Sequence, residues 1–115
     1  MPADETLLED IVDAAAQIAH YIEGLDRPTF LADRKTQDAV VRRIEVMGEA
    51  ATRLSPQLRD AHPEVDWKGL AQLRNFYIHV YRRINYHKVW RTCRNSIPSI
   101  NTAAEQVAAS LTDDT

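Results

Sequence analysis

The stretch Leu73–Tyr81, which reads LRNFYIHVY, carries side chains that together can act on a phosphate ester. The guanidinium of Arg74 is always charged and its donors match the geometry of phosphate oxygens. The imidazole of His79 gains and loses protons near neutral pH. The amide of Asn75 can orient the phosphate or fix the imidazole ring. We therefore predict that Arg74 and His79 are catalytic residues and that Asn75 supports them.

These groups suit the cleavage of RNA without a metal ion. The 2′-hydroxyl of each ribose lies next to the phosphorus, so a base that removes its proton makes it an internal nucleophile. A cation stabilises the charge that builds on the phosphoryl oxygens. The expected products carry a 2′,3′-cyclic phosphate and a 5′-hydroxyl. DNA lacks the 2′-hydroxyl and should be inert.

The spacing of the two predicted catalytic residues poses a geometric problem. Arg74 and His79 are five residues apart, so on an ideal helix they point about 140° away from each other. Either the helix is distorted near His79, or a second copy of the chain supplies the missing group across a symmetric interface. Tyr81 follows Arg74 by seven residues and so shares its face of the helix, within about 20°.

Acidic residues are absent from Trp67 to Ala104, although the whole chain has a net charge of −3. Half of the 14 lysines and arginines lie in that span. A local excess of positive charge favours a polyanionic partner. The residues predicted to bind RNA in this span are Arg82, Arg83, Lys88 and Arg91. The same side chains can also form an ordinary solvated helix face, and that alternative stays open.

Length and composition restrict the fold class. A chain of 115 residues with 44% apolar residues suits a single domain, 1–115, around one core. Three glycines and five prolines provide too few turns for a β-sandwich or a β-barrel. The single cysteine, Cys93, indicates a reduced, cytoplasmic protein, and no apolar run approaches the roughly 20 residues that span a bilayer. The histidines lack zinc-ligand spacing and no glycine-rich phosphate loop occurs, so neither a metal nor a cofactor is expected.

Apolar residues at helical spacing predict an all-α fold, an antiparallel bundle of four main helices with one or two short helices. The first helix is expected to begin at a capping Asp4 and to end near residue 25. The second is expected over about 34–54, and a short helix over 56–61 follows it.

The motif falls on the third main helix, which is expected to follow a cap at Asp66 and to cover 67–82. The fourth begins at a capping Asn85. It contains Pro98, which lacks an N–H and whose ring disturbs the preceding turn, so a kink or break is expected there.

Three residues of the second helix bear on the motif. Gly48 has no side chain, so another helix can approach it closely. Glu45 and Glu49, four residues apart, either face the motif as a carboxylate pair or stay exposed. In the second case Arg42 and Arg53 are partners at helical spacing.

With these residues in place, the chain resembles the HEPN superfamily, and within it the HepT-like toxins of toxin–antitoxin pairs. The family motif is an arginine, a polar residue, three further residues, a histidine, one residue and a tyrosine, here Arg74, Asn75, His79 and Tyr81. Three other blocks are also similar to the family. They are TQDAVVRRIEVMGEAATRL in the second helix, HPEVDWKGLAQLRN before the motif and INYHKVW after it.

The resemblance implies an all-helical homodimer with endoribonuclease activity at a dimer cleft, where Arg74 and His79 of both copies contribute. It also implies a type II/VII-like toxin–antitoxin system, in which a small nucleotidyltransferase antitoxin adenylylates the motif tyrosine, here Tyr81. Because Tyr81 shares the face of Arg74, added phosphates would occupy the anion site and repel RNA.

Two other interpretations of the same residues stay open. The chain can be a non-catalytic helical dimer that binds a nucleotidyltransferase partner, or a module that binds RNA without chemistry. RNA cleavage that requires His79 separates the ribonuclease from both.

Overall fold

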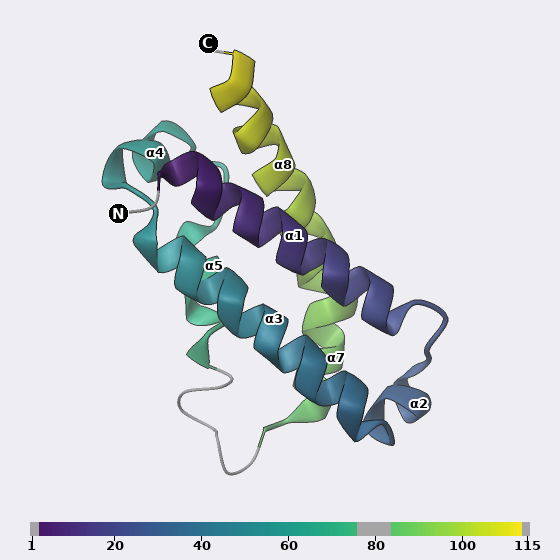
Figure 1. Cartoon of the computed structure of the whole chain (residues 1–115). Coiled ribbons are helices and arrows are strands. Elements are labelled where there is room, and N and C mark those ends of the chain that lie inside the picture. The colour runs from purple at the N-terminus through teal and green to yellow at the C-terminus, as the bar shows by residue number, and fades with distance from the viewer. Residues whose placement is uncertain (1–2, 76–83, 114–115) are drawn as a thin grey trace.

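The computed structural model describes residues 3–75 and 84–113, and the side chains of 112 and 113 are not among the described parts. Every regular element in these ranges is helical, which confirms the predicted all-α class (Figure 1). The elements are α1 (Asp4–Ile22), α2 (Arg27–Leu31), α3 (Arg34–Arg53), α4 (Pro56–Ala61), α5 (Trp67–Gln72), α7 (Tyr86–Arg91), the π-helix η1 (Thr92–Ser96) and α8 (Ile97–Asp113).

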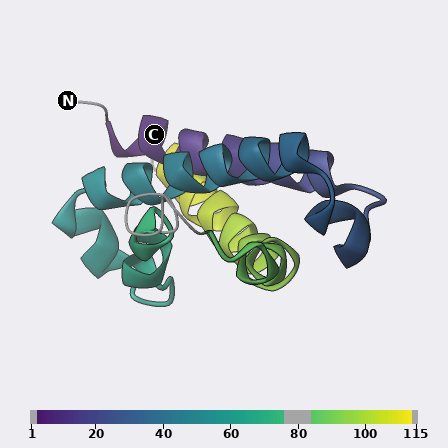
Figure 2. The same cartoon turned by 90° about the horizontal axis from the view of Figure 1, so that it is seen from below.

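The helices form two layers. Helices α1 and α3 run antiparallel along each other and form one layer. Helix α5 and the α7–η1–α8 rod form the second layer, on the other side of the core (Figure 2). Helix α8 packs across α1, whereas α5 packs against α3. No helix of the described ranges is long and apolar enough to cross a membrane.

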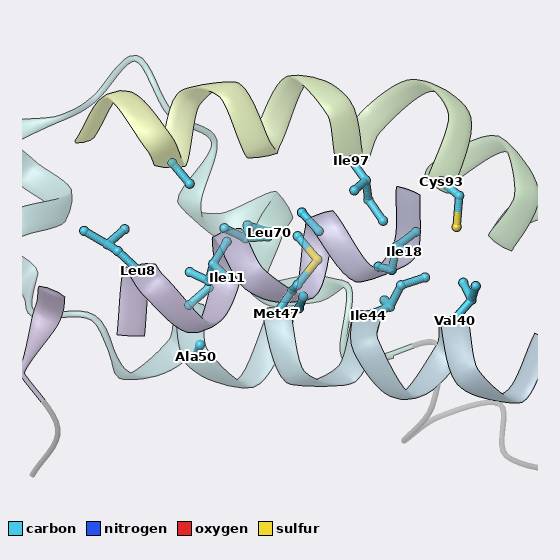
Figure 3. Close-up of a cluster of buried hydrophobic side chains, with 14 of the residues drawn as sticks. Leu8, Ile11, Ile18, Val40, Ile44, Met47, Ala50, Leu70, Cys93 and Ile97 are labelled. Carbon is cyan, nitrogen blue, oxygen red and sulfur yellow. The ribbon is translucent and has the colours of Figure 1, made fainter. Parts of the chain in front are cut away.

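The core fills the space between these layers with aliphatic side chains. Ile11 and Ile18 of α1, Ile44 of α3 and Leu70 of α5 are at most 1% exposed, and they converge in the centre of the bundle (Figure 3). Each side chain of this size stabilises the fold by about 1.5–3 kcal/mol when it leaves water. The apolar stripes read from the sequence are therefore the faces that the helices bury.

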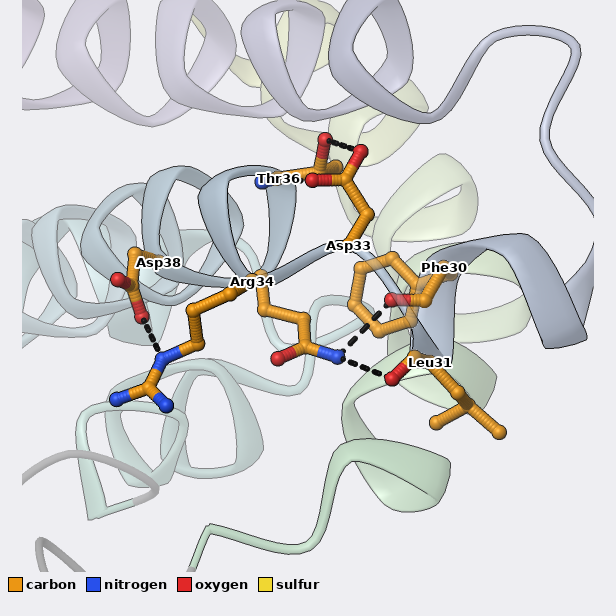
Figure 4. A network of polar contacts seen from close by, with 7 residues as sticks. Phe30, Leu31, Asp33, Arg34, Thr36 and Asp38 are labelled. Carbon is orange, nitrogen blue, oxygen red and sulfur yellow. Dashed lines mark hydrogen bonds and ion pairs between the residues drawn. The ribbon is translucent and has the colours of Figure 1, made fainter.

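A buried amide fastens α2 to α3. Gln37, only 5% exposed, donates from Nε2 to the carbonyl oxygens of Phe30 (2.9 Å) and Leu31 (3.0 Å) at the end of α2 (Figure 4). A buried donor that keeps its partners avoids the cost of desolvation. Asp33, the N-cap residue of α3, also keeps its hydrogen-bond partners. Its carboxylate accepts from the backbone N–H (3.1 Å) and the hydroxyl (2.6 Å) of Thr36. These two hydrogen bonds hold the pKa of Asp33 below its ordinary value.

Several helix boundaries agree with the sequence-based expectations. The short helix α4 covers Pro56–Ala61, as predicted. The predicted caps also form, since Asp66 accepts from Gly69 N–H and Asn85 accepts from Lys88 N–H. The interruption expected near Pro98 is present as η1, in which the N–H of Ile97 donates five residues back to Thr92. This wide turn precedes the proline, whose ring an α-helical turn would not accommodate.

The predicted cap at Asp4 is wrong. Helix α1 begins after Ala3, which makes no side-chain cap. Asp4 instead accepts hydrogen bonds from the backbone N–H (2.9 Å) and the hydroxyl (2.6 Å) of Ser55, between α3 and α4. Its carboxylate thus links the start of α1 to the α3–α4 connection, 51 residues away, a tertiary role that a local capping pattern does not indicate.

Burial makes Cys93 unreactive. The residue is 3% exposed, and desolvation raises the pKa of its thiol from 9.0 to about 12, because the thiolate loses its hydration.

We expect Cys93 of the native protein to resist thiol-specific reagents at pH 8 and to react fully once the protein is unfolded in denaturant, as followed by absorbance. The contribution of Cys93 to stability should be complete below pH 9 and should be lost between pH 9 and about 12, where the unfolded chain ionises first. Rapid labelling of the folded protein would contradict this.

Candidate functional site

The structure describes the first half of the predicted motif. Arg74 and Asn75 follow α5 directly, and both are partly buried. His79 and Tyr81 lie outside the described residues, as do Arg82 and Arg83, so their predicted roles stay predictions. The geometry of the site is therefore built from Arg74 outward.

The predicted continuous helix 67–82 is wrong in its described part. Helix α5 ends at Gln72, and Leu73 and Arg74 form a turn. The N–H of Leu73 donates to the carbonyl of Leu70 only three residues back, at 3.1 Å, which tightens the end of the helix. Arg74 therefore does not lie on a regular α-helix that extends from Trp67.

Gly48 determines where Arg74 lies. A Cβ atom added at Gly48 would lie 2.6 Å from the backbone nitrogen of Arg74 and 2.9 Å from its Cβ. Such distances are too short for atoms that are not bonded, so only glycine lets this backbone rest directly on α3. The close approach expected at Gly48 is confirmed, and it brings the first residue of the motif against the middle of α3.

The next residue of α3 holds the arginine side chain. Nη1 of Arg74 donates to Oε2 of Glu49 at 3.1 Å, and the two side chains are 39% and 52% exposed. Glu45 pairs instead with Arg42 at 3.1 Å. The expected partner of Glu45 is thus confirmed, whereas Glu49 turns to the motif rather than to Arg53.

The Glu49–Arg74 ion pair is suited to exchange. Half-exposed ion pairs contribute only about 0.2–1 kcal/mol, because water screens them and two long side chains must be ordered. A phosphate can therefore replace the carboxylate at the guanidinium with little loss, and it offers the same pair of acceptor oxygens.

The two described residues of the predicted RNA-binding set lie on α7. Lys88 and Arg91 are both exposed, three residues apart on this helix. The span without acidic side chains therefore includes solvent-facing cations on this helix. Asn75, the supporting residue, makes no side-chain hydrogen bond to another described residue.

Comparisons with known proteins place the chain among ribonucleases. The family described as Ribonuclease HepT-like matches residues 11–107. A probable ribonuclease HepT of Thermococcus cleftensis is 34% identical over 87% of this chain and 91% of its own length. A putative RNase of Methanocaldococcus jannaschii is 37% identical over 87% of this chain and 83% of that protein. No solved structure matches the chain.

The close contact at Gly48 should reverse the usual effect of a Gly→Ala substitution on the stability of a helix. Gly→Ala inside a helix normally stabilises it by about 0.5–1 kcal/mol. Gly48→Ala should instead destabilise the protein by about 1–3 kcal/mol, because the methyl group overlaps the backbone of Arg74. Urea denaturation followed by circular dichroism measures the difference.

Glu49→Gln is the matched control for this prediction. It changes the neighbouring residue of α3 without adding volume and removes only a half-exposed ion pair, so its free energy of unfolding should stay within about 1 kcal/mol of the wild type. A Gly48→Ala variant as stable as the wild type would show that the backbone of Arg74 does not lie against α3.

Proposed function

The chain belongs to the Ribonuclease HepT-like family, and from this premise we propose that it is a metal-independent endoribonuclease that uses Arg74 and His79. One observation supports this choice of site more strongly than any other observation. The first residue of the motif is a half-exposed arginine whose backbone is fixed on α3 at Gly48 and whose side chain already holds a carboxylate. That is the arrangement expected of a guanidinium that binds an exchangeable anion.

In the proposed reaction, His79 removes the proton of a ribose 2′-hydroxyl. The 2′-oxygen bonds to phosphorus while the bond from phosphorus to the 5′-oxygen breaks, and that oxygen takes up a proton as it leaves. Arg74 stabilises the negative charge on the phosphoryl oxygens. The products are a 2′,3′-cyclic phosphate and a 5′-hydroxyl. Asn75, adjacent to Arg74, orients the phosphate or the imidazole.

The Glu49–Arg74 ion pair fits this mechanism. In the free protein the carboxylate of Glu49 occupies one donor of Arg74, Nη1, at 3.1 Å. RNA binding would free Glu49 into solvent, to which half of its side chain is already exposed. The guanidinium then meets the phosphate in an orientation that the backbone contact at Gly48 has set, which lowers the entropy cost of positioning it.

A homodimer answers the geometric problem of the motif. On a regular helix Arg74 and His79 would point apart, and the turn at Leu73 and Arg74 does not by itself bring them together, so a second copy that supplies the opposite group would complete the site. The proposal extends to a cytoplasmic toxin that is silenced by a nucleotidyltransferase antitoxin. The silencing step is the transfer of adenylyl groups to Tyr81, whose added phosphates would compete with RNA for Arg74.

The catalytic proposal is tested with the histidine. His79→Ala should lower the rate of RNA cleavage by at least about 100-fold, since a general base contributes roughly 10²–10⁴. End-labelled RNA incubated with purified protein in excess EDTA measures the rate, and the cyclic phosphate identifies the mechanism. A DNA strand of the same sequence should remain intact.

Size-exclusion chromatography should show the variant and the wild type in the same oligomeric state. Equal RNA turnover by His79→Ala would refute the proposed chemistry. RNA binding by the wild type without cleavage would favour a binding module, and failure to bind RNA with retained binding of the transferase would favour the non-catalytic dimer.

The regulatory proposal is tested at Tyr81. Co-expression with the cognate nucleotidyltransferase should add adenylyl groups that mass spectrometry locates on Tyr81, and the modified protein should no longer cleave RNA. Tyr81→Phe should escape modification, whereas Tyr86→Phe, a control on α7, should not. An unmodified Tyr81 beside an active transferase would refute this part of the proposal.

A further inference from the structure

A groove of about 500 Å³ lies where the end of α3 meets α4 and α5, and Figure 1 shows these three segments at the same end of the molecule. Its apolar lining residues are Pro56 of α4 and, on α5, Ala71 and Trp67, of which Trp67 is 7% exposed. Two cations border that surface, Arg59 and Lys68. An apolar floor beside positive charge is the combination that binds single-stranded nucleic acid, because the base or sugar packs on the floor and the phosphate meets the cations.

Neither cation is committed to a partner within the described ranges. Arg59 and Lys68 form no ion pair with another described residue. Nε of Arg59 is buried and has no hydrogen-bond partner among the residues that the structure describes. Turning this guanidinium toward an anion in the groove would therefore break no hydrogen bond to any of those residues. Lys68 is exposed and can reach the same anion with its flexible side chain.

The groove lies next to the part of α3 that holds Arg74. On α3 the wall residue Thr52 lies one turn after Gly48, and its hydroxyl donates to the carbonyl of Glu49 at 2.7 Å. Thr52 is thus about 6 Å along the axis of α3 from the glycine on which the backbone of Arg74 rests. On the other wall Ala71 precedes Arg74 by three residues.

We propose that this groove binds the nucleotide next to the cleaved linkage, with its phosphate on Arg59 and Lys68 and its base or sugar on the apolar floor. The inference rests on the proposed ribonuclease function and deepens it, because it assigns a second phosphate site to the RNA. Asp60 also lines the groove, and its negative carboxylate repels an anion that binds there. The groove therefore holds two cations against one anion.

A groove elsewhere on the molecule shows the contrast. Between α1 and α8 an apolar groove of about 400 Å³ is bordered by Glu9, Asp13 and Glu105. Three carboxylates and no cation would repel a phosphate chain. This groove therefore lacks the positive charge that the groove between α3, α4 and α5 presents.

The test measures binding of a fluorescent single-stranded RNA of about 12 nucleotides by anisotropy, in a His79→Ala background that leaves the RNA uncut. Arg59→Gln and Lys68→Gln should each raise the Kd by about 3- to 10-fold. Each should also reduce the slope of log K against log salt by about 0.7, the value for one phosphate contact on a single strand. Asp60→Asn should act in the opposite direction and lower the Kd at least 2-fold.

Lys35→Gln is the matched control. Lys35 is an exposed lysine near the start of α3, about 26 Å along the helix axis from Thr52, and its loss should leave the Kd and the salt slope unchanged. The opposite signs expected for Lys68→Gln and Asp60→Asn keep the test informative if one variant folds poorly, since misfolding would not tighten binding. Unchanged binding in both glutamine variants, or an equal loss in Lys35→Gln, would overturn the assignment.

Failure of this inference is distinguishable from failure of the proposed function. If wild-type protein cleaves RNA and the groove variants cleave it with the same KM, the ribonuclease stands and the second phosphate site does not. If binding depends on Arg59 and Lys68 while the wild type cleaves no RNA, the groove stands as an RNA site and the catalytic proposal fails.

Discussion

The contact between the backbone of Arg74 and Gly48 is the constraint on which the candidate site depends. A side chain of any size at Gly48 would separate α3 from the turn after α5. Without that approach Glu49 could not reach the guanidinium at 3.1 Å. Because Gly48 has no Cβ atom, the backbone of Arg74 can pack directly on α3, and this contact sets the position of Arg74 relative to the rest of the bundle.

Polar contacts hold the ends of the helices around this arrangement. The carboxylate of Asp4 accepts two hydrogen bonds from Ser55, and the hydroxyl of Ser55 accepts in turn from Leu58 N–H at the start of α4. The position of α4, which carries Arg59 and Asp60, is therefore tied to the first turn of α1. At the other end of α3, Gln37 keeps α2 in place. The apolar core supplies most of the stabilisation, and these contacts set the register of its parts.

The sequence predicted those helices and caps that depend on residues close together in the chain. The second helix, α4 and the caps at Asp66 and Asn85 follow from short-range patterns of apolar, proline and capping residues. The role of Asp4 and the partner of Glu49 depend on residues that are 51 and 25 positions away, and no local pattern encodes them. Arg59 was not recognised either, because it is brought near Lys68 only by the way α4 folds back on α5.

The enclosed sulfur of Cys93 has a practical consequence for experiments on assembly. The chain has one cysteine, which lies in the π-helix η1 and is buried. A cysteine introduced on the surface, for instance in place of Arg91, would be the sole accessible site for a spin label or a dye, with no need to remove the native one. Inter-probe distances measured with such labels would report directly how two copies of the bundle are arranged.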